Sequence, residues 1–97
     1  MARVEIACTL SSNEAADRTQ EWRDALGLVT ERRATESGIR LRLPADPVTV
    51  GRVAELVTRE ADCCAFFSFT LTVEHASVWL DVAAPPDGKP VLDALFA

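Results

Sequence analysis

The sequence predicts one α+β domain spanning residues 1–97, a two-layer sandwich with helices on one face of a sheet. Several short segments alternate apolar and polar residues, which is typical of strands with one buried face. Two longer segments repeat apolar residues at helical spacing, and each is followed by a pair of the alternating segments. Together these observations predict the ferredoxin-like order βαββαβ, extended by a further strand and a C-terminal helix.

The first segments predict a strand and then a helix. Residues 3–8 alternate in hydropathy, so we expect a central strand with Cys8 on its buried face. Ser11-Ser12-Asn13-Glu14 matches a capping box, in which a hydroxyl and a carboxylate satisfy free backbone N–H groups at a helix start. A helix is therefore predicted over residues 12–27.

The next two segments predict a hairpin. Residues 28–36 are polar and predict an edge strand, and Glu36-Ser37-Gly38 has the composition of a hairpin turn. Residues 39–43 alternate aliphatic side chains with arginine, which predicts the second strand of the hairpin. Arg40 and Arg42 are therefore expected on the face of the sheet that points away from the core.

The second half of the chain repeats the helix and strand pair. Asp46-Pro47 predicts a helix start, with aspartate as the N-cap and proline in the first turn. Residues 67–73 and 78–82 predict two strands joined by a turn near His75, and residues 91–96 predict a short closing helix. The polar face of the sheet is expected to carry Arg40, Arg42, Ser68, Thr70, Thr72, Trp79 and Asp81.

Composition limits the classes of function. The formal net charge is −5, which argues against general binding of nucleic acid or of an anionic membrane, since both need clustered lysine and arginine. No apolar run approaches the ~20 residues that cross a bilayer. The first residues also lack a signal-peptide pattern, so the cytoplasm is the expected location. Three cysteines in a reducing compartment are not expected to form a disulfide framework.

The chemistry in this sequence is concentrated in its three cysteines, Cys8, Cys63 and Cys64. In the ferredoxin-like order, the strand at residues 3–8 and the second helix run parallel, so their carboxyl ends meet at one edge of the sheet. This connectivity allows Cys8 to approach Cys63 and Cys64. Three thiolates form a soft donor set, which prefers Hg(II), As(III), Cd(II), Cu(I) or Zn(II). The sequence therefore predicts a small thiol protein that binds a soft metal or metalloid ion and no organic cofactor.

Two carboxylates accompany the cysteine pair. Glu60 lies one helical turn before Cys63, and Asp62 immediately precedes it. Either carboxylate is a candidate for a weak fourth ligand, or for a partner that orients the thiols. The lone His75 is expected in a solvated turn rather than at the metal.

Two other classes of protein stay open. A buried cysteine often behaves as a small hydrophobe, and Cys8 and Cys64 both fit a core. Cys63 is the exception, because it does not belong to the predicted buried stripe of the second helix, which comprises Val50, Val53, Val57, Ala61 and Cys64. If all three cysteines are core residues, the protein is an interaction module that forms a homodimer through the polar face around Trp79, Arg40 and Arg42.

The third class is a thiol redox or organometal-processing enzyme. A thiol at a helix C-terminus is poorly placed for nucleophilic chemistry, since that end of the helix dipole raises a thiol pKa. The sequence therefore favours binding over catalysis.

The chain resembles a family of small uncharacterised bacterial proteins with a Cys-Thr-Leu segment followed by an E-x-x-C-C-x-F-x-x-F signature. The matching residues are Cys8-Thr9-Leu10 and Glu60-Ala61-Asp62-Cys63-Cys64-Ala65-Phe66-Phe67-Ser68-Phe69. Similar segments occur fused to MerR-type metal-responsive regulators, so the resemblance implies heavy-metal or metalloid binding through the cysteines. Many relatives have proline where this chain has Ala65, which makes the connection after the cysteine pair less stiff here.

Overall fold

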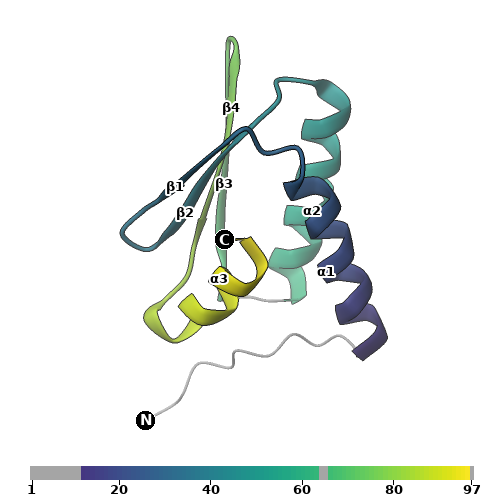
Figure 1. The fold of residues 1–97 in the computed structure, drawn as a ribbon, viewed down its shortest axis with the longest axis vertical. Coiled ribbons are helices and arrows are strands. Elements are labelled where there is room, and N and C mark those ends of the chain that lie inside the picture. Colours follow the sequence, from purple (N-terminus) through teal and green to yellow (C-terminus); the bar gives the residue numbers. More distant parts are fainter. Residues whose placement is uncertain (1–11, 64–65, 97) are drawn as a thin grey trace.

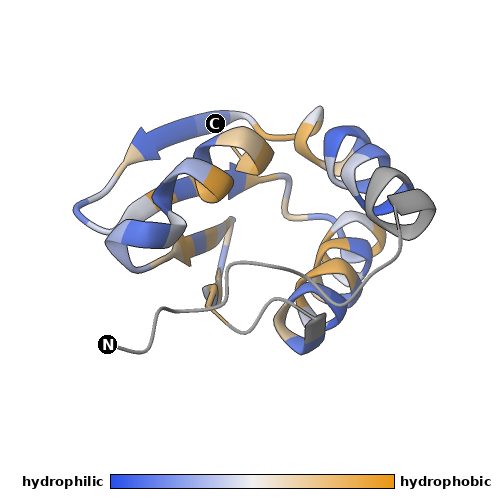
Figure 2. Cartoon of the chain, turned by 90° about the horizontal axis from the view of Figure 1, so that it is seen from below, coloured by the Kyte–Doolittle hydropathy of each residue, from blue (hydrophilic) through white to orange (hydrophobic). Residues whose placement is uncertain are grey.

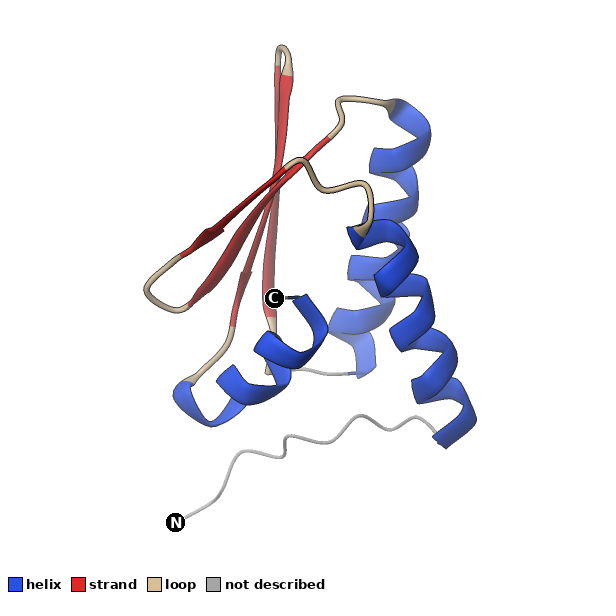
Figure 3. Ribbon diagram, viewed as in Figure 1, coloured by secondary structure: helices blue, strands red, loops and turns tan. Residues whose placement is uncertain are grey.

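The computed structural model describes the backbone of residues 12–63 and 66–96, and the side chains of residues 17–62 and 66–96. The predicted strand at residues 3–8 lies outside these ranges. In chain order the elements are α1 (Ser12–Leu26), β1 (Glu31–Ala34), β2 (Gly38–Leu43), α2 (Pro47–Cys63), β3 (Ser68–Glu74), β4 (Ser77–Ala83), the 3₁₀ turn η1 (Pro86–Gly88) and α3 (Lys89–Phe96). The predicted α+β class is confirmed, and so are all of these elements except η1, which was not predicted from the sequence (Figures 1 and 3).

The described sheet is antiparallel and has the strand order β1-β2-β4-β3. Two helix–strand–strand units, α1β1β2 and α2β3β4, contribute one hairpin each, and β2 pairs with β4 at the centre. This order differs from the ferredoxin-like one, because the place beside β2 that the ferredoxin-like order gives to residues 3–8 is occupied by β4. Strand order therefore gives no reason to place Cys8 near Cys63 and Cys64.

All three described helices pack against one face of the sheet (Figure 1). The period of two in the strands supplies the buried side chains of this face, and each helix adds an apolar stripe. The buried core consists of Trp22, Ala25, Leu26, Ile39, Leu41, Leu43, Val53, Leu56, Phe67, Val78, Leu80, Val82, Leu92 and Phe96. β1, by contrast, is hydrophilic along most of its length, as expected for an edge strand (Figure 2).

The buried line of α2 differs from the predicted stripe. Among residues 47–62 of this helix, Val53, Leu56 and Glu60 are buried, whereas Ala61 is exposed. These positions follow the spacing i, i+3, i+7 of one helix face. Val53 of the predicted stripe is buried, and Val50 and Val57 pack against the core as predicted. The prediction is wrong at Ala61, because Glu60 takes the buried position at this end of the helix.

Arg32 connects β1 to the ends of two helices. Its guanidinium donates through Nη1 to the carbonyl of Phe96 at 2.7 Å and through Nη2 to the carbonyl of Leu26 at 3.2 Å. The last carbonyls of a helix have no partner within the helix, so a cation there supplies both a donor and a favourable charge. Arg32 thereby fixes the carboxyl ends of α1 and α3 to the edge of the sheet.

The start of α2 is capped as predicted, and the cap makes stability depend on pH. Asp46 accepts from the backbone N–H of Thr49 at 3.0 Å and from its hydroxyl at 2.9 Å. The backbone N–H of Thr49, followed by the hydroxyl, lowers the pKa of Asp46 from its ordinary value of 3.8. A carboxyl whose pKa is lower in the folded protein stabilises the fold above its unfolded pKa, and this contribution is lost as the pH falls through the folded pKa.

We therefore expect Asp46→Asn, which keeps a good N-cap but does not titrate, to be less stable than the parent protein at about pH 6. The difference should shrink as the pH falls from about 4 towards 2. Urea denaturation of both proteins across this range measures it. A difference that does not change with pH would contradict this account of the cap.

Candidate functional site

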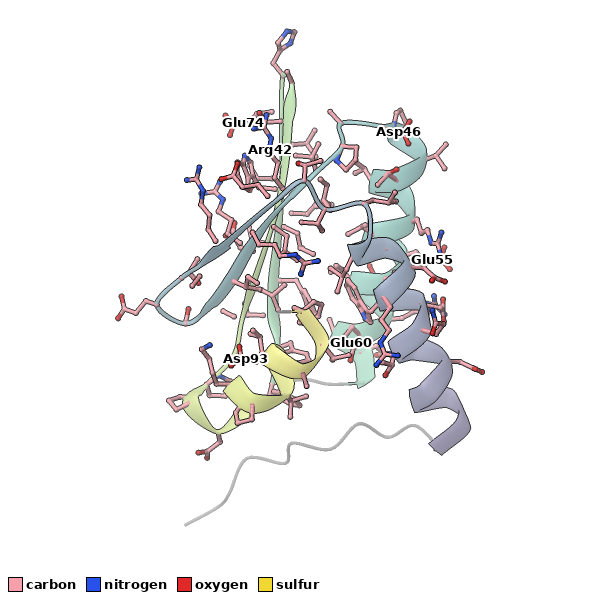
Figure 4. All side chains as sticks on the ribbon, in the orientation of Figure 1. Arg42, Asp46, Glu55, Glu60, Glu74 and Asp93 are labelled. Carbon is pink, nitrogen blue, oxygen red and sulfur yellow. The ribbon has the colours of Figure 1, made fainter. Side chains whose placement is uncertain are left out.

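Glu60 is buried inside the helix layer. From the sequence, its carboxylate was expected to act on the cysteines instead. Its side chain is only 1% exposed. Arg18 of α1 donates to its Oε1 from Nη1 at 3.0 Å, and Trp22 of α1 donates to the same oxygen from Nε1 at 2.9 Å. Figure 4 shows Glu60 on α2 where this helix faces α1. The carboxylate therefore joins the two helices.

The network around Glu60 is a largely buried ion pair, since the Arg18 side chain is only 11% exposed. Burying a charge is costly unless it is paired and hydrogen-bonded, and here both conditions are met. Arg18 and Trp22 lie on α1 at i and i+4, so one face of α1 supplies both donors. Glu60 is thus engaged in holding the fold together one helical turn before Cys63.

Aromatic rings surround this network on the side of the sheet. The Trp22 indole meets Phe96 edge to face with ring centroids 4.8 Å apart, and it lies parallel to Phe69 at 6.3 Å. Phe67 contacts Phe96 at 5.7 Å, and Phe66 lies against Phe67 at 4.4 Å. Such a cluster excludes water and lowers the local dielectric constant, which strengthens the ion pair that it covers.

Of the three cysteines, the structure describes only the backbone of Cys63. Cys63 is the last residue of α2, one helical turn after Glu60. Cys8, Cys64 and the side chain of Cys63 lie outside the described parts of the chain. The predicted convergence of the three thiols therefore stays a prediction.

The two candidate carboxylates point in different directions. Asp62 is exposed, whereas Glu60 is buried, as expected for positions about 200° apart around a helix. Among the residues whose side chains are described, no three histidines, cysteines or carboxylates gather closely enough to hold a metal ion. His75 is exposed in the turn between β3 and β4, as predicted.

A second cluster lies on the opposite face of the sheet, where the structure brings together Arg40, Arg42 and Trp79. The guanidinium carbon of Arg40 lies 4.4 Å from the centre of the Trp79 ring, and that of Arg42 lies 5.5 Å away. Arg33 of β1 is a third member, also at 5.5 Å, which sequence reasoning did not assign to the site. Its pairing with Arg40 across the β1–β2 hairpin puts it on this face. Three cations around one indole form a set of cation–π contacts.

Arg18 is a site residue that could not be found from the sequence. It is 42 positions from Glu60, and neither its neighbours nor its spacing marks it as the partner of a buried carboxylate. Only the packing of α1 on α2 brings the two together.

The comparisons with known proteins add no further residue assignment. No family model, no curated protein and no solved structure matches this chain. In the parts of the chain that the structure describes, no helix combines the length and the apolar character needed to cross a membrane.

Proposed function

We propose that the protein binds a soft metal or metalloid ion through the thiolates of Cys8, Cys63 and Cys64. The observation that carries the proposal is the place of Cys63, which ends α2 one turn after the buried Glu60. Binding of an ion reduces the charge of three thiolates, to a net −1 with a divalent ion and to zero with As(III), so the complex is favoured over free thiolates near an aromatic cluster.

The same placement favours a metal ligand over a nucleophile. α2 ends at Cys63, and the negative end of a helix dipole disfavours a free thiolate there. A metal ion overcomes this penalty because it binds the sulfur directly and releases the proton. With arsenite, three thiols would form three As–S bonds, and the three hydroxyl groups of arsenous acid would leave as three water molecules.

In this proposal the two carboxylates have separate roles. Glu60 keeps its bonds to Arg18 and Trp22 and fixes the end of α2, so that it positions the cysteine pair without binding the ion. Asp62, which is exposed, is the carboxylate that remains available as a weak oxygen ligand for ions that take four donors.

Anaerobic titration of the reduced protein with Zn(II), Cd(II), Hg(II) and arsenite tests the proposal. Ultraviolet thiolate-to-metal bands follow binding, and native mass spectrometry gives the stoichiometry. We expect one tight equivalent of at least one ion, and we expect Cys8→Ser, Cys63→Ser and Cys64→Ser each to weaken it by more than roughly tenfold, a loss of about 1.4 kcal/mol or more.

Ala61→Ser is the matched control, because it places a hydroxyl on an exposed position of the same helix and removes no thiol. Its affinity should equal that of the parent protein. Binding no tighter than that of a simple thiol such as glutathione, or a loss that does not depend on which cysteine is replaced, would contradict the proposal.

A further inference from the structure

The face of the sheet opposite the helices is covered by no element of the described chain. Strand pairing puts thirteen residues on this open face: Glu31, Arg33, Gly38, Arg40, Arg42, Ser68, Thr70, Thr72, Glu74, Ser77, Trp79, Asp81 and Ala83. Arginine and tryptophan are the residues most enriched among the energetic centres of protein interfaces. Here they form one cluster near the middle of the face.

The open face is divided into halves of opposite charge. The β1–β2 half holds three arginines and Glu31, a net charge of +2, and the β4–β3 half holds Asp81 and Glu74, a net charge of −2. In Figure 4, Arg42 and Glu74 both lie on the side of the sheet away from α2. A surface of this kind is complementary to itself, provided that a second copy is turned so that unlike halves meet.

One ion pair on this face is incomplete within a single chain. Nε of Arg40 is enclosed and has no hydrogen-bond partner among the described residues, and the nearest carboxylate oxygen, Oδ1 of Asp81, lies 3.8 Å away. The rest of the two side chains is accessible, with Arg40 39% and Asp81 37% exposed, so both charged groups can be approached by a partner from outside the sheet.

We infer that the open face is the interface of a homodimer, in which a two-fold axis runs parallel to the strands between β2 and β4. Such an axis turns the β1–β2 half of one copy onto the β4–β3 half of the other, as an isologous interface requires. Because Arg40 pairs with Asp81 and Arg42 with Trp79 in the β2–β4 register, the same pairs then face each other across the interface.

The result is an alternating ring of charges around the axis. Arg40 and Asp81 of one copy meet Asp81 and Arg40 of the other, so that every charge has unlike neighbours. Arg42 of each copy faces Trp79 of the other, and the cation–π contacts within each chain hold these side chains in place at the interface. Face-to-face packing of two sheets is a common way to bury sheet surfaces of this kind.

A second copy fits this face better than a nucleic acid strand. Half of the face is acidic, and the chain as a whole carries −5, which opposes contact with phosphates. The Trp79 ring is also covered by Arg40 at 4.4 Å, so no base can stack on that side without displacing the guanidinium.

Paired charge reversals test this geometry. Arg40→Asp puts two aspartates in contact across the axis, and Asp81→Arg does the same with two arginines, so each variant should be monomeric at concentrations where the parent protein is dimeric. An equimolar mixture of the two variants should form a heterodimer, because each Asp then meets an Arg. Sedimentation equilibrium with reductant and chelator present measures this without interference from disulfides or bridging metal.

Two further variants complete the design. Trp79→Ala should raise the dimer dissociation constant by roughly 30-fold or more, the effect of losing a central interface residue. Arg52→Asp, an equal charge change on the exposed side of α2, should leave the dimer unchanged. Far-ultraviolet circular dichroism confirms that each variant is folded.

Three results would overturn the inference. The first is a parent protein that stays monomeric up to several hundred micromolar. The second is a dimer that Arg40→Asp and Asp81→Arg do not weaken. The third is a mixture of the two variants that stays monomeric, since the open face would then meet something other than a second copy turned in this way.

Discussion

Glu60→Ala should lower the free energy of unfolding by about 3–5 kcal/mol, the usual cost of removing one partner of a buried ion pair. The variant removes the carboxylate that pairs with Arg18, whose side chain is only 11% exposed, and it removes the acceptor of the Trp22 indole N–H. A domain of this size is stable by only about 5–15 kcal/mol, so the loss is a large part of the total. Urea denaturation with linear extrapolation measures it.

Glu55→Ala is the matched control for this experiment. Glu55 lies on the same helix but is exposed, so its removal should change stability by no more than about 0.5 kcal/mol. Glu60→Gln should fall between the two variants, since it keeps an oxygen acceptor for Trp22 and loses the charge that pairs with Arg18. Equal stability of Glu60→Ala and Glu55→Ala would show that the buried pair does not hold α1 to α2.

Phe96→Ala should destabilise the protein by about 3–5 kcal/mol, as expected when a fully buried phenylalanine is truncated and a cavity remains. Phe96 is 0% exposed and touches Trp22, Phe67 and Phe69, so its ring joins α3 to both the sheet and the helix layer. Thermal or urea denaturation measures the loss, and Trp22 fluorescence reports on the same cluster.

Leu28→Ala provides the comparison for Phe96. Leu28 is 42% exposed, so we expect its truncation to cost much less than that of Phe96. If Phe96→Ala were no more destabilising than Leu28→Ala, α3 would not be part of the core, and the aromatic surroundings of Glu60 would not depend on it.

The sequence was informative where one residue type determines local structure. Asp46 and Pro47 marked the start of α2, and alternation of Ile39, Leu41 and Leu43 with arginine marked both faces of β2. Periodicity shows which face of a strand is buried, but it does not show which strand lies beside it. The pairing of β2 with β4 was therefore not predictable, and the ferredoxin-like order was assumed in its place.

The candidate sites show the same limit. Trp79, Arg40 and Arg42 were expected on one face from alternation alone, and the structure brings them together. Glu60 was expected to act as a weak fourth ligand or to orient the thiols, because its carboxylate lies one helical turn from Cys63. Its burial depends on Arg18, which reaches it only through helix packing, and long-range pairs of this kind leave no pattern in one sequence.

The most direct test of the central claim is mass-resolved alkylation of the reduced protein with and without one equivalent of the ion that binds most tightly. If the three cysteines form one site, the ion should protect Cys8, Cys63 and Cys64 from alkylation together, and a chelator should restore the reactivity of all three. Protection of only one or two of them, or equal reactivity with and without the ion, would contradict a three-thiolate site.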